Sequence, residues 1–184
     1  MSALRIALSG SAGTGKTTLG QALAENLGVP YIEEGFRRRV DGGLQMYKLD
    51  DHARRELIVE LWEEQQELEQ SAKSGFVSDR SCVDFAAFWL HYGLTDAEEE
   101  TKQFMGRMHS AVSQVDRILL FPWGVLPLLF DGVRSTNPWL QLRYQALLEG
   151  LHGMHTPASK LHHIPKSVEF DERLAYATRV SCQS

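Results

Sequence analysis

Short apolar runs alternate with longer stretches of helical periodicity along the chain. The apolar runs are typical of buried strands, and they cover residues 4–8, 29–32, 76–78, 117–121 and 160–164. The periodic stretches predict helices over residues 16–27, 51–71, 81–92, 96–115, 138–151 and 168–180. Because each strand is followed by helical sequence, the pattern indicates an α/β fold with a mostly parallel, five-stranded sheet.

Capping signals refine three of the predicted helix starts. Thr95 with Glu98 has the spacing of a capping box for the helix over 96–115. Asn137 followed by Pro138 is typical of an N-cap with proline at the first helical position. Ser167 is the expected cap of the final helix. These residues predict where three helices begin.

Length and composition fit one soluble domain over residues 1–184, with an irregular lid segment at about 122–137. The net charge of −5 argues against a nucleic-acid binder. No apolar window is long enough for a membrane span. Cys82 and Cys182 form no disulfide framework, so a reduced, cytoplasmic setting is expected. Thirteen of the 19 basic residues are Arg, which indicates either phosphate chemistry or a GC-biased genome.

One complete motif, G-x-x-x-x-G-K-T, follows the first strand and opens the first helix. Its glycines allow the backbone to wrap an anion, Lys16 reaches the β- and γ-phosphates, and Thr17 supplies a hydroxyl to Mg²⁺. The predicted nucleotide-binding residues are Gly10, Ser11, Ala12, Gly13, Thr14, Gly15, Lys16, Thr17 and Thr18. The motif predicts ATP with Mg²⁺ as the ligand, with GTP open. The chain lacks the N-K-x-D guanine motif of GTPases.

The third strand ends in Asp79-Arg80-Ser81. We expect Asp79 to orient Mg²⁺ or act as a general base, and the alternative is a helix N-cap. A ring-forming ATPase would instead show Asp-Glu at this strand end and a second helical domain. The segment resembles the Glu-Arg-Ser and Asp-Arg motifs of deoxynucleoside and thymidylate kinases. That resemblance implies that Arg80 grips phosphate, and a structural salt bridge is the alternative.

Three further segments resemble the small P-loop family that contains the ribosylnicotinamide kinase domain of the bacterial NAD-biosynthesis regulator. They are Val29-Pro-Tyr-Ile-Glu-Glu34-Gly-Phe-Arg37, Asp131-Gly-Val-Arg134-Ser135 and Ser167-Val-Glu-Phe-Asp-Glu-Arg173. The resemblance implies a three-layer α/β/α P-loop NTPase fold of the nucleoside and nucleotide kinase type. It also implies that Glu34 and Arg37 line an acceptor pocket and that Arg134 closes on the γ-phosphate. For Glu34 and Arg37 the alternative is a surface charge cluster, and for Arg134 it is an ordinary loop arginine.

Two functions from different classes follow. The first is a small-molecule kinase that transfers the ATP γ-phosphoryl group to a nucleoside, nucleotide or cofactor precursor, with Lys16, Asp79 and Arg134 as catalytic residues. The second is a regulatory or accessory ATPase without a small-molecule acceptor. A protein that binds nucleotide without turnover is a third, disfavoured by the intact Lys16 and Thr17. The apolar segment 125–130 is expected to pack on adenine, cover an acceptor or form a homodimer contact.

Overall fold

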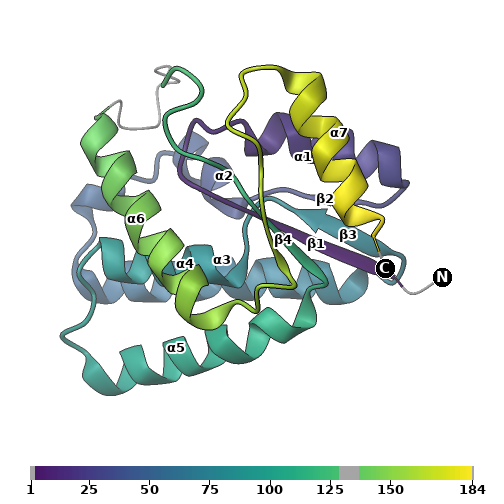
Figure 1. Cartoon of the computed structure of the whole chain (residues 1–184). Coiled ribbons are helices and arrows are strands. Elements are labelled where there is room, and N and C mark those ends of the chain that lie inside the picture. Colours follow the sequence, from purple (N-terminus) through teal and green to yellow (C-terminus); the bar gives the residue numbers. More distant parts are fainter. Residues whose placement is uncertain (1–2, 129–136, 184) are drawn as a thin grey trace.

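The computed structural model describes residues 3–128 and 137–183, and in them five strands form one parallel sheet (Figure 1). The strands are β1 (Leu4–Ser9), β2 (Tyr31–Ile32), β3 (Gly75–Ser78), β4 (Arg117–Leu120) and β5 (Leu161–His163). Their order is β2-β3-β1-β4-β5, so β1 is the central strand. All four neighbouring pairs are parallel, which brings the carboxyl ends of the strands to one edge.

Helices cover both faces of the sheet and complete a three-layer sandwich (Figure 1). They are α1 (Lys16–Leu27), α2 (Gly35–Asp41), α3 (Asp51–Ser71), α4 (Cys82–His91), α5 (Glu98–Ala111), α6 (Pro138–His155) and α7 (Phe170–Ser181). Two short 3-10 helices span Met46–Lys48 and Val112–Gln114. Helices α1 and α7 lie on one face, and α3 to α6 lie on the other. The α/β/α fold predicted from the sequence is confirmed.

Core side chains lie on both faces of the sheet because the central strand alternates its side chains between them. Ile6 and Leu8 pack under α1 and α7. On the opposite face, the core of α3, α4 and α5 includes the rings of Trp62, Trp89 and Phe104. The Trp89 and Phe104 rings stack with centroids 4.5 Å apart. Burial on both faces explains why the strands read as continuous apolar runs.

Two of the predicted caps lie on α6 and α7. The side chain of Asn137 accepts a hydrogen bond from the Trp139 N–H at 3.0 Å, so this cap is confirmed. The Ser167 cap is wrong, because α7 begins only at Phe170. The Ser167 hydroxyl instead accepts the Glu169 N–H at 3.1 Å and so forms a local turn before the helix.

The start of α5 also differs from the prediction. Thr95 is not its cap, since the helix begins at Glu98 after a turn. The neighbouring Asp96 carboxylate pairs with Arg55 of α3 at 2.8 Å, which ties the turn to another helix. Helix α2 was not predicted at all, because its seven residues are too short to show periodicity.

Candidate active site

The glycine-rich loop joins β1 to α1 at the carboxyl edge of the sheet. Gly10, Gly13 and Gly15 have φ angles of 145°, 75° and 83°, a region that favours glycine. Space is also tight at Gly10, where a Cβ would lie 3.0 Å from the Phe121 Cβ and 3.2 Å from the Phe121 carbonyl oxygen. A Cβ on Gly13 would meet only a Leu128 methyl, at 2.8 Å, which can move aside. The loop therefore favours these glycines for their backbone angles, and at Gly10 for close packing as well.

The N–H groups of this loop divide into two sets. The Ser11 and Ala12 N–H groups donate to side-chain oxygens of Gln145 and Gln141 on α6, at 3.0 and 3.2 Å. In the described part of the chain, the N–H groups of residues 13–17 have no hydrogen-bond partner. They lie at the N-terminus of α1, where the helix dipole favours negative charge. This second set is suited to bind a phosphate group.

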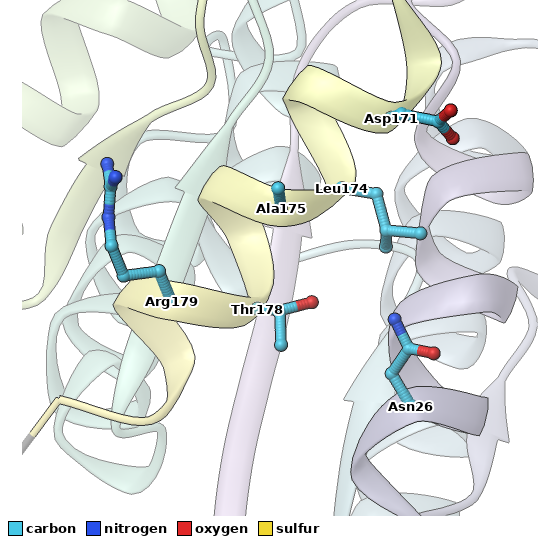
Figure 2. A pocket seen from close by; sticks show the side chains of 6 residues that line it. All are labelled: Asn26, Asp171, Leu174, Ala175, Thr178 and Arg179. Carbon is cyan, nitrogen blue, oxygen red and sulfur yellow. The ribbon is translucent and has the colours of Figure 1, made fainter.

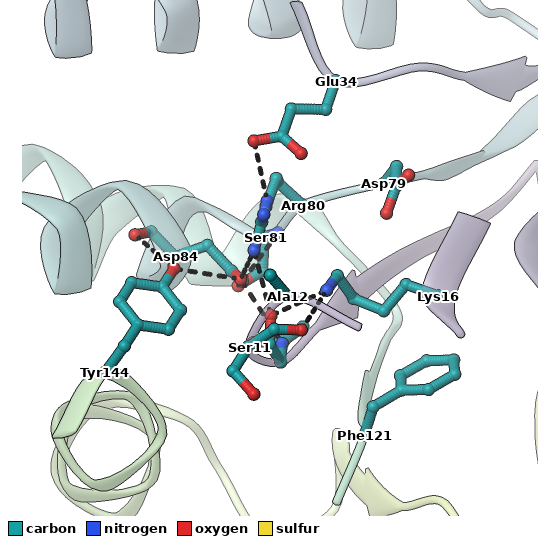
Figure 3. Close-up of polar contacts among 12 residues, drawn as sticks. Ser11, Ala12, Lys16, Glu34, Asp79, Arg80, Ser81, Asp84, Phe121 and Tyr144 are labelled. Atoms are coloured by element: carbon teal, nitrogen blue, oxygen red, sulfur yellow. Dashed lines mark hydrogen bonds and ion pairs between the residues drawn. The ribbon is translucent and has the colours of Figure 1, made fainter. Parts of the chain in front are cut away.

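Lys16 lies buried within the loop that it follows (Figure 3). Its Nζ donates to the carbonyl oxygens of Gly10 and Ser11 at 2.7 and 2.8 Å. Burial, followed by the nearby charge of Arg80, lowers the pKa of Lys16 to about 8. The ammonium group is therefore held against the first two residues of the loop.

Asp79, at the end of β3, contacts two hydroxyl groups through one carboxylate oxygen. Its Oδ2 accepts hydrogen bonds from Thr17 and Tyr31, both at 2.7 Å. Its Oδ1 is buried without a hydrogen-bond partner. Oxygen ligands of this kind are what Mg²⁺ prefers, so the pair of Asp79 and Thr17 fits the predicted metal site. Tyr31 was missed, although it lies in the β2 segment that carried the family resemblance.

Arg80 is the centre of a buried polar cluster (Figure 3). It pairs with Glu34 at 3.1 Å and Asp84 at 3.0 Å, and donates to the Gly10 carbonyl at 2.9 Å. Its guanidinium also lies over the Phe88 ring, 5.1 Å from the centroid. Burial opposes the charge of Arg80, but the nearby carboxylates outweigh it and raise its pKa. The structural salt bridge, one of the two alternatives for Arg80, is present.

Asp84 was missed, although the Ser81-x-x-Asp84 spacing is that of a capping box. Its carboxylate accepts from the Ser81 backbone at 3.1 Å and from the Ser81 hydroxyl at 2.7 Å. Ser81 is thus the N-cap of α4, which replaces the capping role considered for Asp79. Burial alone would raise the pKa of Asp84, but Arg80 and then Lys16 lower it. Asp84 stays ionised and holds Arg80 in place.

The remaining candidates are placed less centrally. Thr18 is exposed in the first turn of α1, and Arg37 lies on α2, half-buried. Arg134 and most of the predicted lid lie outside the described residues. The described part of the apolar segment packs on the loop itself: a Cβ on Gly15 would lie 3.0 Å from a Leu126 methyl. Packing on this loop was not among the three roles expected for the segment.

Arg173 is a further contact that the sequence did not assign. It lies on α7 and donates to the Thr14 carbonyl at 2.6 Å, and its guanidinium lies 5.3 Å from the Phe121 ring centroid. It belonged to the matched C-terminal segment, so that resemblance was the available signal. The loop is therefore contacted from α6 and α7 as well as from β3.

Two hollows lie apart from the loop. An open groove runs between α1 and α7 (Figure 2), lined by Asn26, Asp171, Leu174, Ala175, Thr178 and Arg179. It holds none of the predicted site residues. A narrow apolar cavity lies among α2, α3 and α4, lined by Phe36, Met46, Ile58, Leu61, Phe85, Phe88 and Tyr92. This second hollow shares Phe88 with the Arg80 cluster.

A family model described as "AAA domain" matches residues 5–166. The chain belongs to this AAA-domain family. No curated protein matches the chain. No helix in the described ranges is both long and apolar enough to cross a membrane.

Solved structures of kinases share the fold. A NadR protein in complex with NAD and AMP-PNP is 16% identical with a TM-score of 0.68, over 97% of this chain and 48% of that chain. The AAA-domain chain thus spans about half the length of NadR. Deoxyadenosine kinase from M. mycoides is 12% identical with a TM-score of 0.69, over 96% and 97%. Thymidylate kinase from Candida albicans is 16% identical with a TM-score of 0.64, over 96% and 90%. The protein has a P-loop kinase-like fold.

Proposed function

We propose that this AAA-domain protein is an ATP- and Mg²⁺-dependent kinase that phosphorylates a small molecule. The observation that carries the proposal is the pairing of Asp79 with Thr17 at 2.7 Å beside the phosphate loop. One carboxylate oxygen orients the threonine hydroxyl, and the other is buried without a partner. A carboxylate at this strand end helps hold Mg²⁺ in P-loop proteins that transfer or hydrolyse the γ-phosphoryl group, so the pair supports turnover over binding alone.

The loop is the ATP end of the site in this proposal. The N–H groups of residues 13–17 and the Lys16 ammonium surround the triphosphate, and their positive character offsets its charge. Asp79 and Thr17 hold Mg²⁺, which when bound neutralises charge on the phosphate oxygens. NadR was solved with AMP-PNP, which is consistent with a triphosphate in this fold.

The acceptor end is assigned to the carboxyl ends of β2 and β3. Glu34 follows β2 and Asp79 follows β3, so both carboxylates reach the edge where the loop lies. Glu34 is 8% exposed and pairs with Arg80. The narrow apolar cavity among α2, α3 and α4 has room for about one water molecule, so it is not part of the acceptor site. An acceptor with a hydroxyl or phosphate head suits these two carboxylates and Arg80.

In the reaction, an acceptor oxygen attacks the γ-phosphorus in line, the bond from that phosphorus to the β–γ bridging oxygen breaks, and ADP leaves. The proton of a hydroxyl acceptor passes to a general base, for which Asp79 is the candidate, and then to solvent. Lys16 stabilises the charge that develops on the phosphate oxygens. The oxygen of Asp79 that has no hydrogen-bond partner is available for either role expected from the sequence, orienting Mg²⁺ or acting as a general base. The proposal also includes two arginines. Arg37 would line the acceptor pocket, and Arg134, in the expected lid segment at about 122–137, would close on the γ-phosphate.

The test uses ATP·Mg²⁺ and a panel of nucleosides, nucleotides and pyridine ribosides, with ADP formation as the readout. At least one acceptor is expected to stimulate ADP formation and to appear as a phosphorylated product. Asp79→Asn should remove most of the Mg²⁺-dependent rate, since the amide is a poor metal ligand. Asp96→Asn is the matched control, because Asp96 is a surface carboxylate that pairs with Arg55.

The outcomes separate the candidate functions. Steady hydrolysis that no acceptor stimulates would contradict the kinase and favour the regulatory ATPase. Full turnover by Asp79→Asn would remove the metal and catalytic roles of Asp79. A Lys16→Ala variant that keeps full nucleotide affinity would refute the assignment of the loop.

A further inference from the structure

Helix α6 holds the phosphate loop from outside the anion site. The buried Ser11 N–H donates to the Gln145 Oε1 at 3.0 Å, although the two residues are 134 positions apart. The next N–H, of Ala12, donates to the Gln141 Oε1 at 3.2 Å. Residues four apart lie on one face of a helix, so α6 presents both amides to consecutive residues of the loop.

The surroundings of Gln145 fix which way its amide points. Its Nε2 donates to the Phe121 carbonyl at 3.1 Å and to Glu149 at 2.9 Å. Because these partners are acceptors, the NH₂ group faces them and the carbonyl oxygen faces Ser11. The side chain is only 2% exposed, so water does not compete for these bonds. One buried amide therefore joins the end of β1 to the end of β4.

A histidine of α6 also contacts the end of β1. The His152 Nε2 lies 2.8 Å from the Ser9 hydroxyl, and its Nδ1 lies 2.9 Å from the Thr156 hydroxyl. Burial lowers the pKa of His152 to about 4, so the ring is neutral at pH 7. Three polar side chains of α6 thus contact the chain between Ser9 and Ala12.

These contacts explain the division of the loop N–H groups. Gln145 and Gln141 occupy the N–H groups of Ser11 and Ala12, while those of residues 13–17 have no partner among the described residues. Ser11 is fully buried, so without Gln145 its N–H must find another acceptor. The peptide would have to turn, and the N–H groups that follow would turn with it. A loop already held in shape loses less conformational freedom when a ligand binds.

We propose that Gln145, supported by Gln141, is a positioning residue for nucleotide binding that keeps the phosphate loop in its anion-binding shape. The inference rests on the proposed function, since it assumes that the loop takes a nucleotide phosphate. It goes beyond that function because it assigns part of the nucleotide affinity to a helix that does not supply the phosphate-binding N–H groups. The effect applies to both ATP and ADP, which share the α- and β-phosphates.

The test is calorimetric titration of ATP·Mg²⁺ and ADP·Mg²⁺ into the full chain and its variants. Gln145→Met keeps the length of the side chain and removes its hydrogen bonds, so the Kd for both nucleotides should rise about tenfold. Gln141→Met removes a half-buried contact and should raise the Kd about threefold. The control is Thr101→Val, which removes the acceptor of the Trp89 indole N–H and a bond to the Leu94 carbonyl, far from the loop.

A local readout separates positioning from stability. Amide hydrogen exchange should quicken at Ser11 in Gln145→Met and at Ala12 in Gln141→Met. Thr101→Val should lower Tm without changing either Kd. If Gln145→Met lowers Tm but binds nucleotide within twofold of the wild type, the positioning role is refuted. Should Gln145→Met fail to fold, an unchanged Kd in Gln141→Met refutes it instead. Failure of the wild type to bind any nucleotide would refute the proposed function.

Discussion

Lys16 leads to a prediction about the pH dependence of nucleotide binding. Its pKa in the ligand-free protein is about 8, lowered first by burial. About nine tenths of Lys16 is therefore charged at pH 7, and about one tenth at pH 9. If only the charged form binds the triphosphate, the Kd for ATP·Mg²⁺ rises about tenfold between these values, or about 1.4 kcal/mol. A lysine with the ordinary pKa of 10.5 would stay charged throughout, and the Kd would stay constant.

The assay is calorimetric titration at pH 7, 8 and 9, repeated at pH 8 in buffers of different ionisation enthalpy. Binding at pH 8 should take up about half a proton, because the phosphate raises the pKa of Lys16 above the working pH. Phosphate groups with a second pKa near 6 are already ionised there and contribute little. Lys16→Arg is the matched control: arginine stays charged over this range, so any affinity it retains should not change with pH.

A Kd that is constant within twofold from pH 7 to 9, together with no buffer dependence at pH 8, would refute the reasoning. It would mean that Lys16 is not desolvated as its contacts with the two loop carbonyls indicate. A tenfold rise that persists in Lys16→Arg would assign the pH dependence to another group.

Three further predictions concern stability. Asp84→Asn should lower the free energy of unfolding by about 3 kcal/mol in urea denaturation, because it leaves the buried Arg80 short of a counter-charge; an unchanged midpoint would contradict this. Gly75→Ala should cost more than about 2 kcal/mol, since φ is 99° and a Cβ would collide with the backbone of β1, whereas Gly93→Ala, at φ 72° in open space, should cost about 1 kcal/mol. As the pH falls, His152 is protonated at a higher pH in the unfolded chain than in the folded protein. The free energy of unfolding should therefore fall by up to about 3 kcal/mol between pH 6.5 and 4. His152→Gln should remove much of this pH dependence.

The sequence predicts best what short stretches of chain determine. The glycine-rich loop, Lys16 and Thr17 lie within eight residues, and their geometry follows from local backbone angles. Asp79 is predictable because it ends a strand, and the ends of parallel strands meet at one edge. The alternation of strands and helices predicts the layers, because the helices that connect parallel strands pack on the faces of the sheet.

Contacts across long separations carry no local pattern. Gln145 reaches the loop over 134 residues, and nothing in its neighbours on α6 distinguishes it from an ordinary surface glutamine. Tyr31 reaches Asp79 over 48 residues in the same way. Asp84, in contrast, has a local signal in its capping-box spacing with Ser81. The cap at Thr95 fails because α5 begins only at Glu98, after a turn in which Asp96 pairs with Arg55 of α3. Except at Asp84, local preference alone does not predict these contacts.

The spread of the loop's contacts along the chain has a consequence for biosynthesis. The Ser11 N–H bonds to Gln145 and the Thr14 carbonyl bonds to Arg173, and both partners are synthesised long after the loop. At about 5–20 residues per second, the ribosome needs roughly 8–32 s to extend the chain from Thr14 to Arg173. During that time the nascent loop lacks the side chains that hold its outer surface. A nucleotide that binds as proposed would therefore stabilise the chain only after α6 and α7 have docked.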